Sequence, residues 1–129
     1  MNGMANEISF TGKLIVDNGY YIVQQTDLTL DQTGKHYFSD TVDLTTTPVN
    51  LYVAPSLVTY GWAWFTNLDD TDTIEIGIQE DPAYGSIFFA FIGLAPGEKC
   101  FLPLHKYSSS LAARTESGTA ILEYGVFER

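Results

Sequence analysis

Thr73-Ile74-Glu75-Ile76-Gly77-Ile78-Gln79 alternates apolar and polar residues without a break. Successive side chains of a β-strand point to opposite faces, so we expect the three isoleucines on one buried face and the polar residues in solvent. Similar strand-like runs cover residues 8–16, 20–29, 37–44, 49–53, 60–66 and 120–127. Residues 86–91, Ser-Ile-Phe-Phe-Ala-Phe, predict a strand that is buried on both faces. We expect a helical turn only at residues 108–116, which are too poor in apolar residues for a full amphipathic helix.

Turn residues separate these runs. Asp17-Asn18-Gly19 predicts a hairpin, because Asn-Gly accepts positive φ angles at little cost. Pro96-Gly97 fits the centre of a type II turn, in which proline sets φ and glycine takes a positive φ. About eight short strands with turns between them predict an all-β, antiparallel fold, a sandwich or a barrel, with almost no helix. We expect one domain over residues 1–129, with residues 1–7 as a flexible N-terminus.

The composition excludes several classes of protein. The chain has 129 residues, of which 6 are Lys or Arg and 16 are Asp or Glu, for a net charge of −10. The six basic residues are scattered, so we expect no binding to nucleic acid, which requires neutralised phosphates. The longest apolar stretch, residues 87–94, is too short to span a bilayer. The first seven residues do not form a signal peptide, so we expect synthesis in the cytoplasm without cleaved export.

Residues with reactive or metal-binding side chains fall into no known motif. The acidic segment Asp69-Asp70-Thr71-Asp72 has carboxylates that suit a hard cation, but it lacks the spacing of an EF-hand loop. Asp is also an ordinary turn residue, so we expect a turn and no metal. His36 and His105 occupy no zinc-binding frame, and the single Cys100 lies in an apolar run that predicts a buried thiol. We therefore expect no enzyme activity and no cofactor.

Aromatic residues are the richest feature, with 8 Tyr, 8 Phe and 2 Trp. Trp62 and Trp64 lie two residues apart and share one strand face, and Tyr20 and Tyr21 open another strand. Such side chains pack in a core, anchor a subunit interface or stack on sugar rings. We keep Trp62, Trp64, Tyr20 and Tyr21 as a candidate interface or ligand platform.

A longer pattern of strands and turns covers residues 60–127. Its parts are Trp64-Phe65-Thr66-Asn67-Leu68-Asp69, Ile74-Glu75-Ile76-Gly77, Phe89-Ala90-Phe91-Ile92-Gly93-Leu94-Ala95-Pro96-Gly97-Glu98, Pro103-Leu104, Leu111-Ala112-Ala113 and Ala120-Ile121-Leu122-Glu123-Tyr124. This pattern resembles small virion proteins of tailed bacteriophages. The resemblance implies a jelly-roll-like sandwich built into a phage particle, as a capsid decoration, head-fibre, neck or tail component. It carries over no catalytic residues.

The leading hypothesis is therefore a virion structural protein that is made in the host cytoplasm and acts by self-association and docking onto other virion proteins. With 45% hydrophobic and 17% charged residues, a monomer is expected to leave an apolar patch exposed. We expect a homo-oligomer, and the resemblance to phage particles suggests a trimer. The alternative is a carbohydrate- or receptor-binding β-sandwich module.

Overall fold

The computed structural model describes the backbone of residues 7–17 and 22–31, and the backbone and side chains of residues 36–57, 59–79, 87–104 and 110–128. The chain divides into two compact units, residues 1–35 and residues 36–129, and each is described by itself. The prediction of a single domain over residues 1–129 stays a prediction. Of the segment expected to be flexible, only Glu7 is among the described residues, and it begins the first strand.

The first unit contains one antiparallel hairpin. Strand β1 (Glu7–Asp17) pairs with β2 (Ile22–Asp31), from Glu7 opposite Asp31 to Asp17 opposite Ile22. The register shifts between Phe10 and Lys13, as it does at a β-bulge. This pairing agrees with the hairpin predicted from Asp17-Asn18-Gly19, although residues 18–21 lie outside the described part. A two-stranded hairpin is at best marginally stable alone in water.

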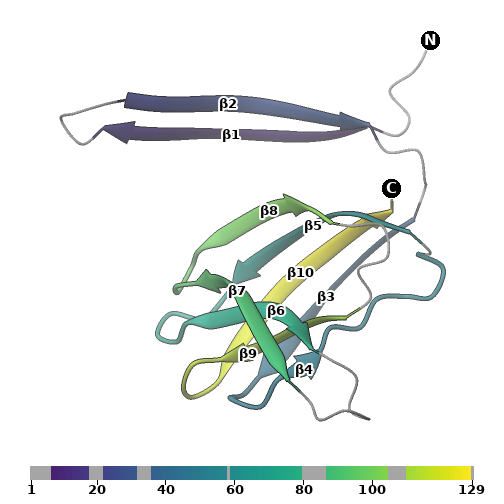
Figure 1. The fold of residues 1–129 in the computed structure, drawn as a ribbon, viewed down its shortest axis with the longest axis vertical. Coiled ribbons are helices and arrows are strands. Elements are labelled where there is room, and N and C mark those ends of the chain that lie inside the picture. Colours follow the sequence, from purple (N-terminus) through teal and green to yellow (C-terminus); the bar gives the residue numbers. More distant parts are fainter. Residues whose placement is uncertain are drawn as a thin grey trace. The chain divides into compact units, whose positions relative to one another are not determined.

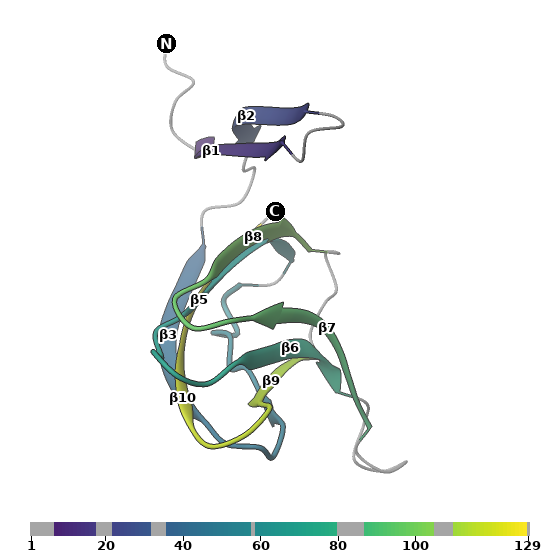
Figure 2. The same ribbon diagram turned by 90° about the vertical axis from the view of Figure 1, so that its left-hand side faces the viewer.

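The second unit is an antiparallel β-sandwich, and the prediction of an all-β fold is confirmed (Figures 1 and 2). Its two four-stranded sheets have the orders β3-β10-β5-β8 and β4-β9-β6-β7. No helix occurs among the residues that the structure describes. The strands are β3 (Tyr37–Leu44), β4 (Val49–Asn50), β5 (Tyr60–Asn67), β6 (Ile74–Gln79), β7 (Phe88–Leu94), β8 (Lys99–Pro103), β9 (Leu111–Thr115) and β10 (Ala120–Glu128).

The pairing of these eight strands is that of a jelly roll. The first strand of the unit pairs with the last, β3 with β10, and the second with the second-last, β4 with β9. The inner strands follow the same rule, because β5 pairs with β8 and β6 with β7. The unit is therefore one long hairpin of four strand pairs that has been rolled into two sheets, which is the arrangement of jelly rolls. The jelly-roll-like fold implied by the resemblance agrees with this strand order.

The core lies between the two sheets and follows the period-two pattern of the sequence. Ala63 and Phe65 of β5 point inward with 0% and 1% exposure, and the residues that alternate with them along the strand are half-buried. From the other sheet, Ile74 and Ile76 of β6 are fully buried, as their alternation predicted. The third isoleucine of that strand, Ile78, is 44% exposed. The prediction for it was wrong, because β6 extends beyond the covered part of the core after a register shift that follows Ile76.

Two further expectations need correction. Residues 111–115 of the expected helical turn form strand β9 instead, paired with β4 and β6. The small side chains of Ala112 and Ala113, both at 0% exposure, fit the crowded centre of a sheet. The weak apolar pattern of this segment did not reveal a strand. The segment predicted at residues 86–91 is described from Ile87 onward and is not buried on both faces, because β7 is an edge strand on which Phe89 is 49% exposed and Phe91 57%. A run of apolar residues cannot show whether a strand has a neighbour on each side.

The turn predicted at Pro96-Gly97 is confirmed. Gly97 has a φ of 77°, and the Glu98 amide donates a hydrogen bond of 2.9 Å to the Ala95 carbonyl. This combination is that of a type II turn with glycine in the left-handed position. The turn joins β7 of one sheet to β8 of the other and so brings the two sheets face to face.

Candidate functional site

The outer face of the β3-β10-β5-β8 sheet carries a cluster of aromatic side chains. Because β5 alternates, Ala63 and Phe65 enter the core while Trp62 and Trp64 point to the outer face. The register places Trp62 beside Phe127 of β10 and Trp64 beside Phe101 of β8. Tyr37 lies opposite Phe127 on β3. We call Tyr37, Trp62, Trp64, Phe101 and Phe127 the aromatic face.

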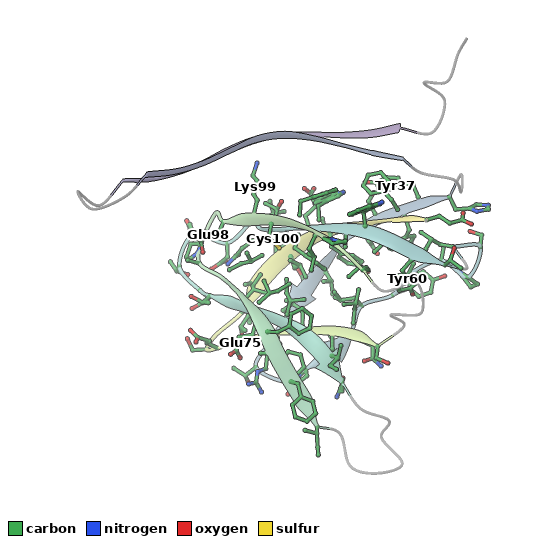
Figure 3. The ribbon with its side chains drawn as sticks, turned by 45° about the horizontal axis from the view of Figure 1, so that its top comes forward. Tyr37, Tyr60, Glu75, Glu98, Lys99 and Cys100 are labelled. Carbon is green, nitrogen blue, oxygen red and sulfur yellow. The ribbon has the colours of Figure 1, made fainter. Side chains whose placement is uncertain are left out.

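The rings of the aromatic face pack against one another. The Trp62 and Phe101 rings are stacked, with centroids 6.1 Å apart and an interplanar angle of 5°. The Tyr37 and Phe127 rings are 4.5 Å apart. Tyr37, which Figure 3 labels, is the most open member, with 49% of its surface exposed. The other four are half-buried, so the cluster offers ring edges and part of their faces to solvent.

Trp64 lies over a glycine of the neighbouring strand. It pairs directly with Gly125 of β10, and a Cβ added to Gly125 would lie 2.2 Å from the indole Nε1. An aromatic ring that covers a glycine across a sheet replaces the packing that the glycine lacks. The side chain of Trp64 therefore supports its own sheet, and this use limits how much of the indole face is open to a ligand.

The structure describes two of the four residues of the predicted platform. Trp62 and Trp64 do share one face, whereas Tyr20 and Tyr21 lie outside the described residues. Sequence reasoning did not select Tyr37, Phe101 and Phe127, because their neighbours on the sheet come from distant parts of the chain. The alternation of side-chain direction along a strand, which places Phe101 on the outer face, was the one local signal that could have identified it.

The acidic turn uses its first carboxylate to hold the backbone. Asp69 Oδ2 accepts hydrogen bonds from the amides of Thr71 (3.1 Å) and Asp72 (2.7 Å), and from the Thr71 hydroxyl (3.0 Å). These bonds, led by the one from Asp72, lower the pKa of Asp69 below its ordinary value. No three His, Cys, Asp or Glu side chains gather as metal ligands among the described residues. Asp69 thus acts as the turn residue that the sequence favoured.

Asn67 connects two parts of the pattern that resembles phage proteins. Its side chain is 0% exposed, and its Nδ2 donates to the carbonyls of Asp72 (2.9 Å) and Leu94 (3.0 Å). Its Oδ1 accepts a hydrogen bond of 2.9 Å from the Asp69 amide. Its backbone bonds the turn after β7 through Gly97 (3.1 Å) and Glu98 (3.0 Å). The Asn-Leu-Asp and Leu-x-Pro-Gly-Glu segments therefore meet, and their shared role is to hold the end of the sandwich.

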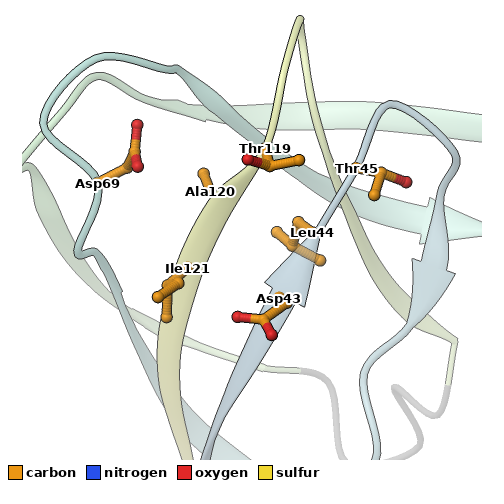
Figure 4. A pocket seen from close by; sticks show the side chains of 7 residues that line it. All are labelled: Asp43, Leu44, Thr45, Asp69, Thr119, Ala120 and Ile121. Carbon is orange, nitrogen blue, oxygen red and sulfur yellow. The ribbon is translucent and has the colours of Figure 1, made fainter.

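A shallow hollow lies beside this end of the sandwich (Figure 4). It has a volume of about 390 Å³ and contains two carboxylates and two threonine hydroxyls, together with aliphatic groups. None of its side chains is aromatic, and the carboxylate of Asp69 already serves the turn. The lining residues are Asp43, Leu44, Thr45, Asp69, Thr119, Ala120 and Ile121.

The remaining reactive side chains are used structurally. Cys100 is half-buried and packs against the core, and burial raises the pKa of its thiol, which opposes formation of a nucleophilic thiolate (Figure 3). His36 forms a hydrogen bond through its Nδ1 with the Glu128 carboxylate, which also accepts from the His36 amide at 2.9 Å. On the outer face of the second sheet, Arg114 Nε donates to Glu75 at 2.7 Å. His105 lies outside the described residues.

No protein-family model matches the chain, and no curated protein matches it at a significant level. Within the described residues, no helix is long and apolar enough to cross a membrane. The strand order and the placement of the side chains therefore carry the functional argument.

Proposed function

We propose that this protein is a structural component of a bacteriophage virion that acts by self-association and by docking onto other virion proteins. Within the particle it would serve as a capsid decoration, head fibre, or neck or tail part. The observation that carries this proposal is the jelly-roll strand order, with each strand of the first half paired to its counterpart in the second. Viral capsid proteins, lectins and cupins are among the proteins that use this architecture.

The use of the pattern residues supports a structural role. Hydrogen bonds that join the two sheets are formed by Asn67, Gly97 and Glu98, and the Asp69 carboxylate holds a turn. The thiol of Cys100 packs against the core. The proposal accordingly includes no catalytic step, no cofactor and no metal.

Exposed apolar side chains support docking. Tyr37, Tyr52, Phe89 and Phe91 are between 49% and 61% exposed, in a chain that carries a net charge of −10. Apolar patches on a soluble surface usually mark interfaces. At physiological salt the charges of two copies are screened beyond about 8 Å, so apolar contacts can overcome the repulsion.

The direct test is to find the protein in particles. Antibodies raised against the recombinant chain should label virions purified through a density gradient, in immunogold electron microscopy and in immunoblots of the particle band. We also expect the chain to self-associate in solution, and the resemblance predicts a trimer. Absence of the chain from purified particles, combined with its presence in the soluble lysate, would refute the proposal.

A carbohydrate- or receptor-binding module is the second candidate, and the aromatic face favours it. Partly exposed aromatic rings on a β-sandwich can stack on sugar rings. In a glycan array, Trp62→Ala or Trp64→Ala should then abolish binding, whereas Tyr52→Ala, at an aromatic residue that is 61% exposed outside the aromatic face, should not. Binding that is absent from the wild-type chain, or insensitive to both tryptophan changes, would exclude this function for the aromatic face.

A further inference from the structure

Strand β7 presents apolar side chains at the edge of its sheet. It is the last strand in the order β4-β9-β6-β7. Ile87, Phe89 and Phe91 occupy alternate positions and are 47%, 49% and 57% exposed. Ile78 of β6 lies opposite Phe89 and is 44% exposed, so the two side chains share a face. We call Ile78, Ile87, Phe89 and Phe91 the β7 strip.

This edge has only one of the usual protections against pairing. An edge strand presents unpaired amide and carbonyl groups, and proteins commonly blunt such edges with charged residues, proline or a bulge. Residues 87–94, Ile-Phe-Phe-Ala-Phe-Ile-Gly-Leu, contain no charged residue and no proline. That one protection is the register shift between Ile76 and Gly77, which leaves Phe91 without a direct partner on β6, whereas Phe88, Phe89 and Ala90 pair in register. No described strand pairs with that outer edge.

The charges near the β7 strip favour a partner that is itself uncharged there. The strip itself contains no charged residue. The ion pair of Glu75 and Arg114 (2.7 Å), with the Arg114 guanidinium 4.8 Å from the centroid of Phe88, lies on the other face of the sheet. A basic partner would find no free carboxylate on the strip, and an acidic partner no free cation. A second copy of this chain places apolar side chains opposite apolar side chains, with no like charges facing each other.

We propose that two copies of the chain pair through β7, antiparallel, about a two-fold axis at Phe89. This register uses the whole exposed row, because Ile87 then lies opposite Phe91 of the partner subunit and Phe89 opposite its own counterpart. On the other face it places the large Phe88 opposite the small Ala90 of the partner subunit. The inference rests on the self-association in the proposed function, and it replaces the expected trimer with a dimer, since a two-fold contact closes on itself.

The area of the contact sets its strength. If each phenylalanine has roughly 200 Å² of surface, Phe89 and Phe91 together expose about 200 Å² per copy at 49% and 57%. The rings of two copies then contribute about 400 Å², against the ~1,200 Å² at the lower limit of stable interfaces. Ile78, Ile87 and the paired backbone add to this area without closing the gap. We therefore expect a weak dimer whose population rises with protein concentration and with salt.

Sedimentation velocity of the full chain over a concentration series, in low and moderate salt, tests the proposal. The wild type should shift from monomer toward dimer, and Phe89→Lys and Phe89→Glu should each stay monomeric at concentrations where the wild type is mostly dimeric. A mixture of the two variants should restore the dimer, because position 89 faces itself across the axis. Leu68→Lys, at a residue 50% exposed in the loop after β5 and outside the β7 strip, is the matched control and should behave as the wild type.

A cross-link checks the register independently of side-chain burial. Directly opposite residues of antiparallel strands have Cα atoms about 4.5–5.5 Å apart, within the range that a disulfide spans. Phe89→Cys should therefore form a covalent dimer on mild oxidation, whereas Leu68→Cys and the wild type, which contains only Cys100, should not. Far-UV circular dichroism confirms that each variant is folded.

The outcomes separate the two proposals. A wild-type chain that stays monomeric in every condition would overturn both the β7 contact and the proposed self-association. A wild-type oligomer that survives Phe89→Lys and Phe89→Glu would overturn the β7 contact alone and leave self-association through another surface. A dimer lost in both variants and recovered in their mixture is the result that we expect.

Discussion

Replacing Asn67 by alanine should destabilise the sandwich by about 3 kcal/mol. The side chain is 0% exposed and makes three hydrogen bonds of 2.9–3.0 Å to the backbone of two loops. Each hydrogen bond contributes about 1 kcal/mol net, and truncation also leaves the Leu94 carbonyl with one partner fewer in a buried setting. In a unit of this size, a loss of 3 kcal/mol lowers the melting temperature by roughly 12–24 °C.

Urea unfolding and thermal melts followed by far-UV circular dichroism measure this loss. Asn50→Ala, at an exposed residue of β4, is the matched control and should change stability by less than about 0.5 kcal/mol. A loss below about 1 kcal/mol for Asn67→Ala would refute the argument that this amide holds the two loops together.

The variant Asn67→Asp separates hydrogen-bond donation from packing. The carboxylate keeps the shape of the amide and can accept from the Asp69 amide, but its second oxygen would face the carbonyls of Asp72 and Leu94. Burial and these carbonyls should raise the pKa of the new carboxyl in the folded state. A raised folded pKa means that stability is retained at low pH and lost as pH rises above the unfolded value of about 4. The deficit relative to wild type should therefore be largest at pH 7 and shrink below about pH 4.

Three further changes have outcomes that follow from the packing and the pKa shifts. Gly125→Ala should lower the free energy of unfolding by about 1–3 kcal/mol and shift the fluorescence of Trp64, since the new methyl group would displace the indole. Gly93→Ala, with nothing within 4 Å of the added Cβ, should leave stability nearly unchanged, and equal effects of the two changes would contradict this reasoning. Burial, with smaller contributions from neighbouring Asp and Tyr groups, raises the pKa of Tyr124 to about 12, so wild-type stability should fall as pH rises from about 10 to about 12. Tyr124→Phe should be about 1 kcal/mol less stable than the wild type at pH 7 and should lose less stability over that pH interval. Because the pKa of Asp69 is lowered, its stabilising effect is present above about pH 4 and is lost as pH falls below it. The free energy of unfolding, measured in urea titrations at pH 2–5, should therefore depend less on pH in Asp69→Asn than in the wild type, and an unchanged profile would count against the turn hydrogen bonds.

The fold class and several turns could be predicted from local patterns of residues. Alternation in residues 73–79 and 60–66 identified strands with one buried face, because side-chain direction along a strand depends only on local backbone geometry. Pro96-Gly97 identified its turn for the same reason, since the allowed φ angles of these two residues are properties of the residues themselves. The shared face of Trp62 and Trp64 also followed from their spacing alone.

The strand order and the edges of the sheets were decided only by the tertiary structure. Residues 87–94 are apolar enough to lie between two neighbours, yet β7 has a neighbour on one side and leaves Phe89 and Phe91 exposed. The pairing of β5 with β10 likewise places Gly125 under Trp64 across 61 positions of sequence, and brings Asn67 to the carbonyl of Leu94. Lateral pairing depends on hydrogen bonds and packing between distant segments, and a local pattern contains no information about which segment will be the neighbour.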